Sequence, residues 1–204
     1  MVLSDAGGDD SSSGPSLTIE ANGTAINSLT LVSYQEVTLR AVYKDEDGVE
    51  QTPSSVAWTR SHTGLGSFYT ANTATAVFKA TSGSISGTNV FIQVECDGLT
   101  KKIPAKVESM SIGFSYSGGN NVVNTGSKQI TATVTRNGVT DTTASITWST
   151  SNPTYPGNFL PNPSSSGQTV TYTPLIPSGM TGSIYVEATA YGVSFNPGIF
   201  NITN

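Results

Sequence analysis

A short tryptophan-centred pattern occurs twice in this chain and constrains the fold more than any other feature. The first copy reads Ser55-Val56-Ala57-Trp58-Thr59-Arg60-Ser61, and the second reads Ser145-Ile146-Thr147-Trp148-Ser149-Thr150-Ser151. The copies hold the only two tryptophans of the chain, and the dipeptides Gly48-Val49 and Gly138-Val139 precede them. Self-similarity at one period of about 90 residues indicates two copies of one structural unit.

Alternating apolar and polar residues flank each tryptophan, as expected of half-buried strands. Matched apolar positions run through both copies: Leu39, Ala41 and Tyr43 against Ile130, Ala132 and Val134, and Val90, Ile92, Val94 and Cys96 against Ile184, Val186, Ala188 and Ala190. Turn signals such as Asn22-Gly23 and Asp97-Gly98 separate the runs. About seven short strands per unit predict an all-β fold of two tandem immunoglobulin-like antiparallel β-sandwiches.

The predicted organisation is a flexible leader over residues 1–16, one sandwich over 17–107 and a second over 108–204. Each indole ring is expected to face inward across the sandwich. The predicted structural core comprises Trp58, Leu39, Val94 and Cys96 in the first sandwich and Trp148, Ile130, Ile146 and Val186 in the second. Cys96 is the only cysteine, so each core must form without an intramolecular disulfide.

The charge balance limits the classes of partner. The net charge is −5, and the nine basic residues are scattered apart from Lys101-Lys102, so we predict no nucleic-acid binding. No apolar stretch approaches the roughly 20 residues that span a bilayer, so we predict no transmembrane segment. Only 11% of residues are charged, a composition that favours an exported protein over a cytosolic enzyme. We therefore expect an extracellular or cell-surface location.

The combined motifs resemble the group 2 bacterial immunoglobulin-like domains of the invasin and intimin type. The pattern is carried by residues 37–48, 55–61 and 90–100, and again by 130–151 and 184–194. The second unit departs from it in a long segment rich in Pro, Asn and Ser from Ser149 to Gly167. The resemblance implies a non-catalytic structural or adhesive module of a bacterial cell-surface or secreted protein, whose partner is a host or surface protein or a glycan.

Residues 1–16 are polar after Leu3 and rich in Gly, Asp and Ser. They resemble the segment that follows the lipidated cysteine of bacterial lipoproteins, with Ala6 in the place of the cysteine. That resemblance implies a lipid anchor upstream of this chain. The alternative interpretation is an expression-derived start followed by an unstructured polar segment.

Two candidate binding sites stand out. Tyr155 and Phe159 lie in the long Pro/Asn segment and would stack on sugar rings if exposed, making residues 152–167 a carbohydrate- or protein-binding loop. The alternative is that the loop folds its aromatic residues back over the sandwich. Asp45 and Asp47 could form a calcium-binding turn, although acidic residues next to Gly48 are equally typical of a solvated hairpin. We expect no cofactor.

No arrangement of nucleophile, base and orienting group is recognisable around the single histidine, His62, so we predict no enzymatic activity. A further alternative to the structural module is a filament or virion subunit, in which residues 1–21 pair with the sheet edge of a neighbouring subunit.

Overall fold

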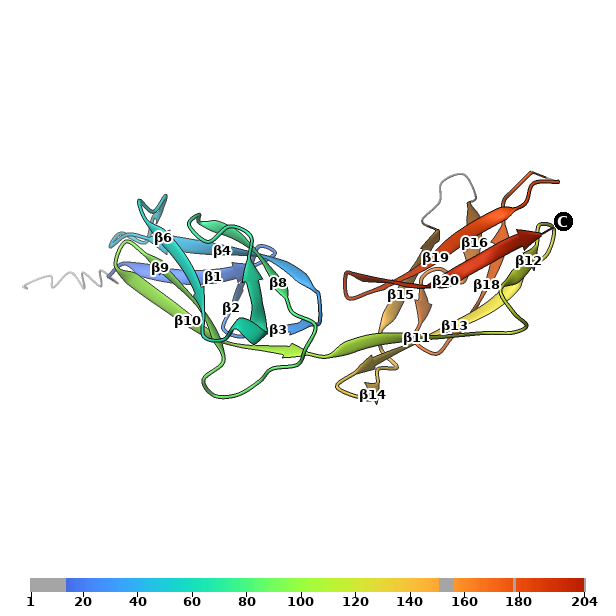
Figure 1. Ribbon diagram of the computed structural model, residues 1–204. Helices are drawn as coiled ribbons and strands as arrows, with labels where there is room; N and C mark the ends of the chain where they lie inside the picture. Colours follow the sequence, from blue (N-terminus) through green and yellow to red (C-terminus); the bar gives the residue numbers. More distant parts are fainter. Residues whose placement is uncertain (1–13, 151–155, 178, 204) are drawn as a thin grey trace, which may run out of the picture. The chain divides into compact units, whose positions relative to one another are not determined.

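A computed structural model describes residues 14–150, 156–177 and 179–203, and apart from one short 3-10 turn (Thr63–Leu65) its regular elements are β-strands (Figure 1). The chain divides into two compact units. The first unit comprises the described residues up to Leu29 together with Val37–Lys79 and Ser86–Lys106. The second comprises Thr30–Glu36, Ala80–Ile85 and the described residues from Val107 onward. This division runs next to the predicted limit between residues 107 and 108 but adds two short segments, so the domain limits remain a prediction.

The first sandwich consists of two sheets. One has the order β2 (Thr24–Ile26), β1 (Ser16–Ala21), β4 (Glu36–Lys44), β8 (Thr75–Ala80) and β7 (Gly66–Phe68), and β5 (Glu50–Gln51) also pairs with β4. The other has the order β3 (Leu29–Val32), β10 (Leu99–Glu108), β9 (Phe91–Cys96) and β6 (Val56–Arg60). Trp58 of β6 pairs with Val94 of β9 in the same sheet.

The second sandwich repeats this order. One sheet runs β11 (Met110–Tyr116), β13 (Lys128–Arg136), β18 (Thr169–Pro174) and β16 (Gly157–Leu160), and β14 (Val139–Thr140) also pairs with β13. The other runs β12 (Asn121–Val123), β20 (Val193–Thr203), β19 (Gly182–Ala190), β15 (Ser145–Thr150) and β17 (Ser164–Ser165). β12 and β20 are parallel, whereas the other described pairs of this unit are antiparallel. The fold class is therefore all-β, with immunoglobulin-like sandwiches.

The core of each unit is built around the same three aromatic rings. In the first, Trp58 lies 5.7 Å from Phe68 and Phe68 lies 4.8 Å from Phe78, measured between ring centroids. In the second, Trp148 lies 5.7 Å from Phe159, and Phe159 lies 5.0 Å from Tyr172. These chains of rings join the two sheets of each sandwich, because Trp belongs to one sheet and the other two rings belong to its partner.

The middle ring of each chain is preceded by a glycine two residues earlier, in the sequences Gly66-Ser67-Phe68 and Gly157-Asn158-Phe159. A Cβ on Gly157 would lie 2.1 Å from Cε2 of Tyr172, and a Cβ on Gly66 would lie 2.8 Å from Cζ of Phe78. Gly157 thus makes room for the third ring, whereas a Cβ on Gly66 would come still closer to the carbonyl oxygen of Lys79, at 2.0 Å. The repeat therefore extends beyond the tryptophans to a Gly-x-Phe motif that positions the rings.

All eight residues predicted to form the core are at most 4% exposed. The indole N–H groups, which would be costly to bury unpaired, donate to the carbonyl oxygen of Thr73 (2.9 Å, from Trp58) and to Oγ of Ser164 (2.9 Å, from Trp148). Burial, and then the neighbouring charge of Asp97, raise the pKa of the Cys96 thiol. Cys96 therefore behaves as a small hydrophobic side chain. Among the described residues no helix has the length and apolar character needed to cross a membrane.

Replacing Tyr172 with phenylalanine is expected to leave the second unit equally stable or to stabilise it by up to about 1 kcal/mol. The phenol oxygen is buried without a hydrogen-bond partner, and burial raises its pKa to about 12. Removing an unsatisfied hydroxyl group removes its desolvation cost and keeps the ring contact with Phe159. Urea denaturation of both proteins measures the difference. A loss above about 1 kcal/mol would instead mean that the hydroxyl group is hydrogen-bonded, for example to a buried water.

Candidate functional site

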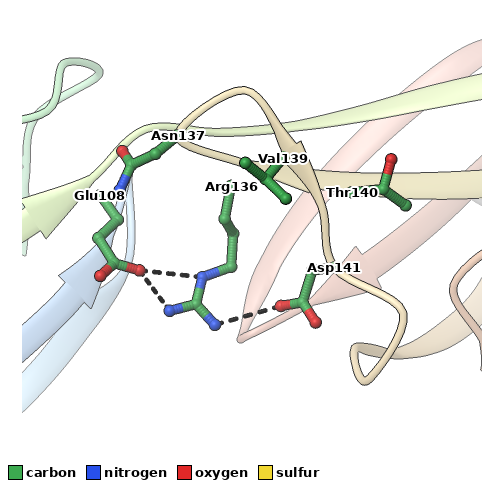
Figure 2. A pocket seen from close by; sticks show the side chains of 6 residues that line it. All are labelled: Glu108, Arg136, Asn137, Val139, Thr140 and Asp141. Carbon is green, nitrogen blue, oxygen red and sulfur yellow. Dashed lines mark hydrogen bonds and ion pairs between the residues drawn. The ribbon is translucent and has the colours of Figure 1, made fainter.

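A cluster of charged side chains surrounds the start of the second sandwich, where β10 ends at Glu108 and β11 begins at Met110 (Figure 2). The residues lie around a shallow, open pocket of about 250 Å³ lined by Glu108, Arg136, Asn137, Val139, Thr140 and Asp141, all of which belong to the second unit. The hairpin between β13 and β14 supplies Arg136, Asn137 and Val139. We call the four side chains Glu108, Arg136, Asp141 and Tyr191 the hairpin clamp.

Arg136 is the centre of the hairpin clamp. Its Nε donates to Oε2 of Glu108 at 3.0 Å, and its Nη2 donates to the same oxygen. Its Nη1 donates to Oδ2 of Asp141 and to the Tyr191 hydroxyl oxygen, both at 3.1 Å. The Tyr191 hydroxyl group in turn donates to Oδ2 of Asp141 at 2.6 Å, and its ring lies 5.1 Å from the guanidinium carbon. Every charge in the cluster thus has a partner of opposite sign.

These contacts shift the titration of both charged partners away from neutral pH. Hydrogen bonding to Glu108 raises the pKa of Arg136, which therefore stays charged. Hydrogen bonds from Tyr191 and Thr143 hold the pKa of Asp141 well below its usual range. Neither group is suited to proton transfer near neutral pH, because a general acid or base needs a pKa close to the operating pH. Arg136 and Asp141 therefore stay charged near neutral pH and act as fixed partners of an ion pair.

Asn137 completes the attachment of the chain just before β11. Its side-chain oxygen accepts a hydrogen bond from the backbone N–H of Ser109 (3.0 Å), and its own backbone N–H donates to the Ser109 carbonyl oxygen (2.9 Å). Asn137 can reach this position because its φ of 48° places it in the left-handed region, which asparagine tolerates in a tight hairpin. Ser109, the one residue between β10 and β11, thus has both its backbone N–H and its carbonyl oxygen hydrogen-bonded to Asn137.

In each unit, a side chain of the turn after β9 or β19 forms hydrogen bonds with the loop that precedes the tryptophan strand. Asp97 and Tyr191 occupy equivalent turns, after β9 and after β19, and both have positive φ angles (46° and 53°). Asp97 accepts hydrogen bonds from the backbone N–H and hydroxyl groups of Ser54 and Ser55, which lie just before β6. Tyr191 donates to Asp141, which lies just before β15. Different side chains therefore tie the same turn to the same loop.

The first unit is expected to lose stability between about pH 4 and pH 2 through Asp97. Hydrogen bonds from Ser54, followed by those from Ser55, lower the pKa of Asp97 to about 2, against about 3.9 for an unfolded chain. A folded-state pKa below the unfolded value gives stability that is complete above pH 4 and is lost as the pH falls through 2. NMR titration of the carboxyl carbon tests this expectation. A midpoint near 4 would contradict it, and an Asp97→Asn variant should remove this part of the pH dependence.

Replacing Arg136 with methionine is expected to destabilise the second unit by about 2 kcal/mol. The change removes the arginine that joins Glu108 and Asp141, whose side chains are 13% and 10% exposed, and so removes the cation that offsets the repulsion between the two carboxylates. The loss should shrink as the pH falls below about 4, because the carboxyl groups of the unfolded chain then take up protons and the ion pairs of the folded protein contribute progressively less. Arg40→Met is the matched control, since Arg40 pairs with Glu20 and Glu50 on an exposed surface and should matter little. Equal effects of the two changes would contradict the role of the clamp.

The predicted calcium turn uses its carboxylate within the chain. Asp45 accepts from the backbone N–H groups of Asp47 (3.0 Å) and Val49 (2.9 Å) and from Nε2 of Gln51 (2.6 Å). The hydrogen bond from Gln51, and then that from Val49, lower the pKa of Asp45. In the described part of the chain, no group of three or more His, Cys, Asp or Glu side chains is placed to hold a metal ion. The structure thus gives Asp45 the role of fastening a hairpin.

The proposed aromatic binding pair is not supported at Phe159, which is 5% exposed and stacks on Trp148 in the core. A sugar cannot stack on that ring. For Phe159 the alternative interpretation holds, in which the segment folds its aromatic residues back over the sandwich, because residues 157–160 form β16, which pairs with β18. The amide of Asn162 also exchanges two hydrogen bonds of 2.9 Å with the backbone of Trp148. Tyr155, like residues 1–13 of the predicted leader, lies outside the described residues.

The hairpin clamp was not predicted from the sequence, although a partial signal exists. Asn137-Gly138 was recognisable as a hairpin turn, and the arginine before it could have been paired with a carboxylate near the start of the unit. The Gly-x-Phe motif was the missed signal for Phe159, because its first copy at Gly66 and Phe68 occupies the same position relative to the tryptophan within one residue.

Comparison with known proteins gives a likeness to solved structures only. No family model and no curated protein matches the chain. The D00-D0 domain of intimin is 14% identical and is covered over its whole length by 92% of this chain, with a TM-score of 0.39. The Yersinia pseudotuberculosis adhesin InvE is 15% identical over 92% of this chain and 59% of its own, also at 0.39. Domains 4 and 5 of the S-layer protein SbsC are 15% identical over 94% and 100%, at 0.37. At these scores the function must be argued from this chain itself.

Proposed function

We propose that this chain is a non-catalytic structural and adhesive module of a bacterial cell-surface or secreted protein, located outside the cell. The observation that carries the proposal is that residues 108–109, at the start of the second unit, are fastened to the β13–β14 hairpin of that same unit. There the chain passes from β10 into β11 through one residue, and the hairpin clamp and Asn137 hold that passage. A module that bears load needs its first strand fastened in this way, because force applied to the chain ahead of β11 must break these contacts before the strand can detach.

The use of polar residues supports the same proposal. The perturbed carboxylates Asp45, Asp97 and Asp141 each accept hydrogen bonds from neighbouring turns and loops. Perturbed titratable groups often mark active sites, but structural networks perturb pKa values as well. Here the direction is the same for all three carboxylates: the charged form is stabilised by fixed donors. That pattern strengthens turns and suits an exposed protein that must resist unfolding and proteolysis.

The location is tested on intact cells of the source organism. Fab fragments raised against the purified chain should label unpermeabilised cells or the culture medium, with an antibody against a cytosolic protein as the negative control. Fab binding that appears only after the cells are permeabilised would overturn the extracellular assignment.

The fastening of residues 108–109 is tested by single-molecule pulling, in which the variant Arg136→Met combined with Asn137→Ala should unfold the second unit at lower force than the unaltered chain. An unchanged unfolding force would remove the mechanical basis of the proposal.

A further inference from the structure

The outer face of the sheet β12-β20-β19-β15 carries cross-strand rows of polar side chains. Asn121, Asn201 and Ser183 form the first row, at paired positions of β12, β20 and β19. All three residues are exposed. Ser183 Oγ donates to Oδ1 of Asn201 at 3.1 Å, and Nδ2 of Asn201 donates to Oδ1 of Asn121 at 3.4 Å. The row is thus held in register by hydrogen bonds between its own side chains.

An aromatic ring lies next to this row. Tyr185 follows Ser183 on the same face of β19, pairs with Ile199 of β20, and is 43% exposed; Ile199 is 38% exposed. Beyond it, Glu187 pairs with Ser149 of β15, whose Oγ donates to Oε2 of Glu187 at 3.3 Å. Residues two apart on a strand are separated by about 7 Å, so the three rows span about 14 Å. An apolar patch therefore lies between two hydrogen-bonding rows on the same face of the sheet.

The first unit offers an internal comparison. Phe91 of β9 holds the position equivalent to Tyr185, but it is half-buried, and Nζ of Lys102 lies 3.5 Å from its ring centroid. The ammonium group of the same sheet thus covers that ring. The four strands β12, β15, β19 and β20 contain neither lysine nor arginine. The same position of the repeat therefore carries a half-buried ring under a cation in the first sandwich and a ring that is 43% exposed in the second.

We propose that this face of the second sandwich, centred on Tyr185, binds a neutral polysaccharide chain. A sugar ring has an apolar face of C–H groups that packs on an aromatic ring, while its edge hydroxyl groups both donate and accept hydrogen bonds. Asn201 offers a donor and an acceptor, and Glu187 offers acceptors. A polyanion is disfavoured, because the face carries the charge of Glu187 and no cation to pair with phosphate, sulfate or uronate. This inference rests on the adhesive part of the proposed function.

The test is native affinity electrophoresis of the whole chain in gels that contain one of three soluble polymers. The polymers are hydroxyethylcellulose (a neutral β-linked glucan), dextran (a neutral α-linked glucan) and polygalacturonate (an anionic polymer). Migration should be retarded by a neutral glucan and not by the polyuronate. Tyr185→Ala should weaken the retardation about tenfold, which corresponds to about 1.4 kcal/mol. Tyr185→Phe keeps the ring and should bind nearly as well as the unaltered chain.

Phe91→Ala removes the matched ring of the first unit and should leave the retardation unchanged, with thermal unfolding of each variant as the check on folding. Retardation by neither neutral glucan, or equal retardation of Tyr185→Ala, would overturn the proposal. So would concentration-dependent association of the chain that Tyr185→Ala abolishes in the absence of polymer, since a second copy would then cover the face. Fab labelling of intact cells does not depend on Tyr185, so a failure here is distinguishable from a failure of the surface location.

Discussion

Trp148→Ala is expected to lower the free energy of unfolding of the second unit by about 3–5 kcal/mol and to leave the first unit unchanged. The indole ring is 3% exposed, stacks on Phe159 at 5.7 Å, and contacts Phe114 edge-on at 6.2 Å. Truncation removes the ring that joins the two sheets and leaves a cavity among aromatic side chains that cannot collapse easily. It also leaves the Ser164 hydroxyl group, which is 4% exposed as a residue, without its donor.

Two tryptophans in two units make this prediction measurable in one experiment. In Trp148→Ala the remaining indole, Trp58, reports only on the first unit, so its fluorescence transition in urea should match that of the unaltered chain. Hydrogen exchange of peptides from β15 and β19 reports on the second unit and should show the loss. Trp58→Ala is the reciprocal control and should weaken only the first unit. A loss below about 1 kcal/mol for either change would mean that the ring does not join its sheets.

Much of the fold could be predicted from the sequence, because strands of this kind are specified locally. Apolar residues at every second position indicated which side of a strand faces inward. The repeat supported these assignments, because apolar residues occur at matching positions in both copies. Residues such as Leu39 and Ile130 were predicted to be buried on this basis, and they are 0% and 1% exposed. The short strands β2, β3, β5, β7, β12, β14, β16 and β17 were not predicted, since two to four residues carry too little periodic signal.

The candidate sites were less predictable, for two physical reasons. The hairpin clamp joins Glu108, Arg136, Asp141 and Tyr191, which are distant in sequence and meet only when β10, β13 and β19 have been brought together. The burial of Phe159 could not be predicted for a different reason, because composition alone described its segment as a loop rich in Pro and Asn. Loop composition reports backbone preference and does not tell where a side chain points. The outer face around Tyr185 likewise emerges only when the rows of four paired strands are known.

Gly66→Ala is expected to destabilise the first unit by roughly 3–5 kcal/mol, more than Gly157→Ala destabilises the second. Two costs combine at Gly66. Its φ of 144° is rarely adopted by residues that have a Cβ, and that Cβ would lie 2.0 Å from the carbonyl oxygen of Lys79. Backbone of the paired strand β8 cannot move away without breaking the sheet. Hydrogen exchange of β7 and β8 peptides in urea would measure the loss.

At Gly157 only the steric cost applies, because its φ is not positive and the nearest atoms belong to the ring of Tyr172. Overpacking of this kind costs about 1–3 kcal/mol. The double change Gly157→Ala with Tyr172→Leu should recover part of that loss, since the smaller side chain yields the space that the methyl group needs. No comparable rescue should follow from Phe78→Leu in the Gly66→Ala variant, because there the methyl group meets a carbonyl oxygen. If Phe78→Leu did rescue Gly66→Ala, the third ring, and not the backbone of β8, would be what demands a glycine at both copies of the Gly-x-Phe motif.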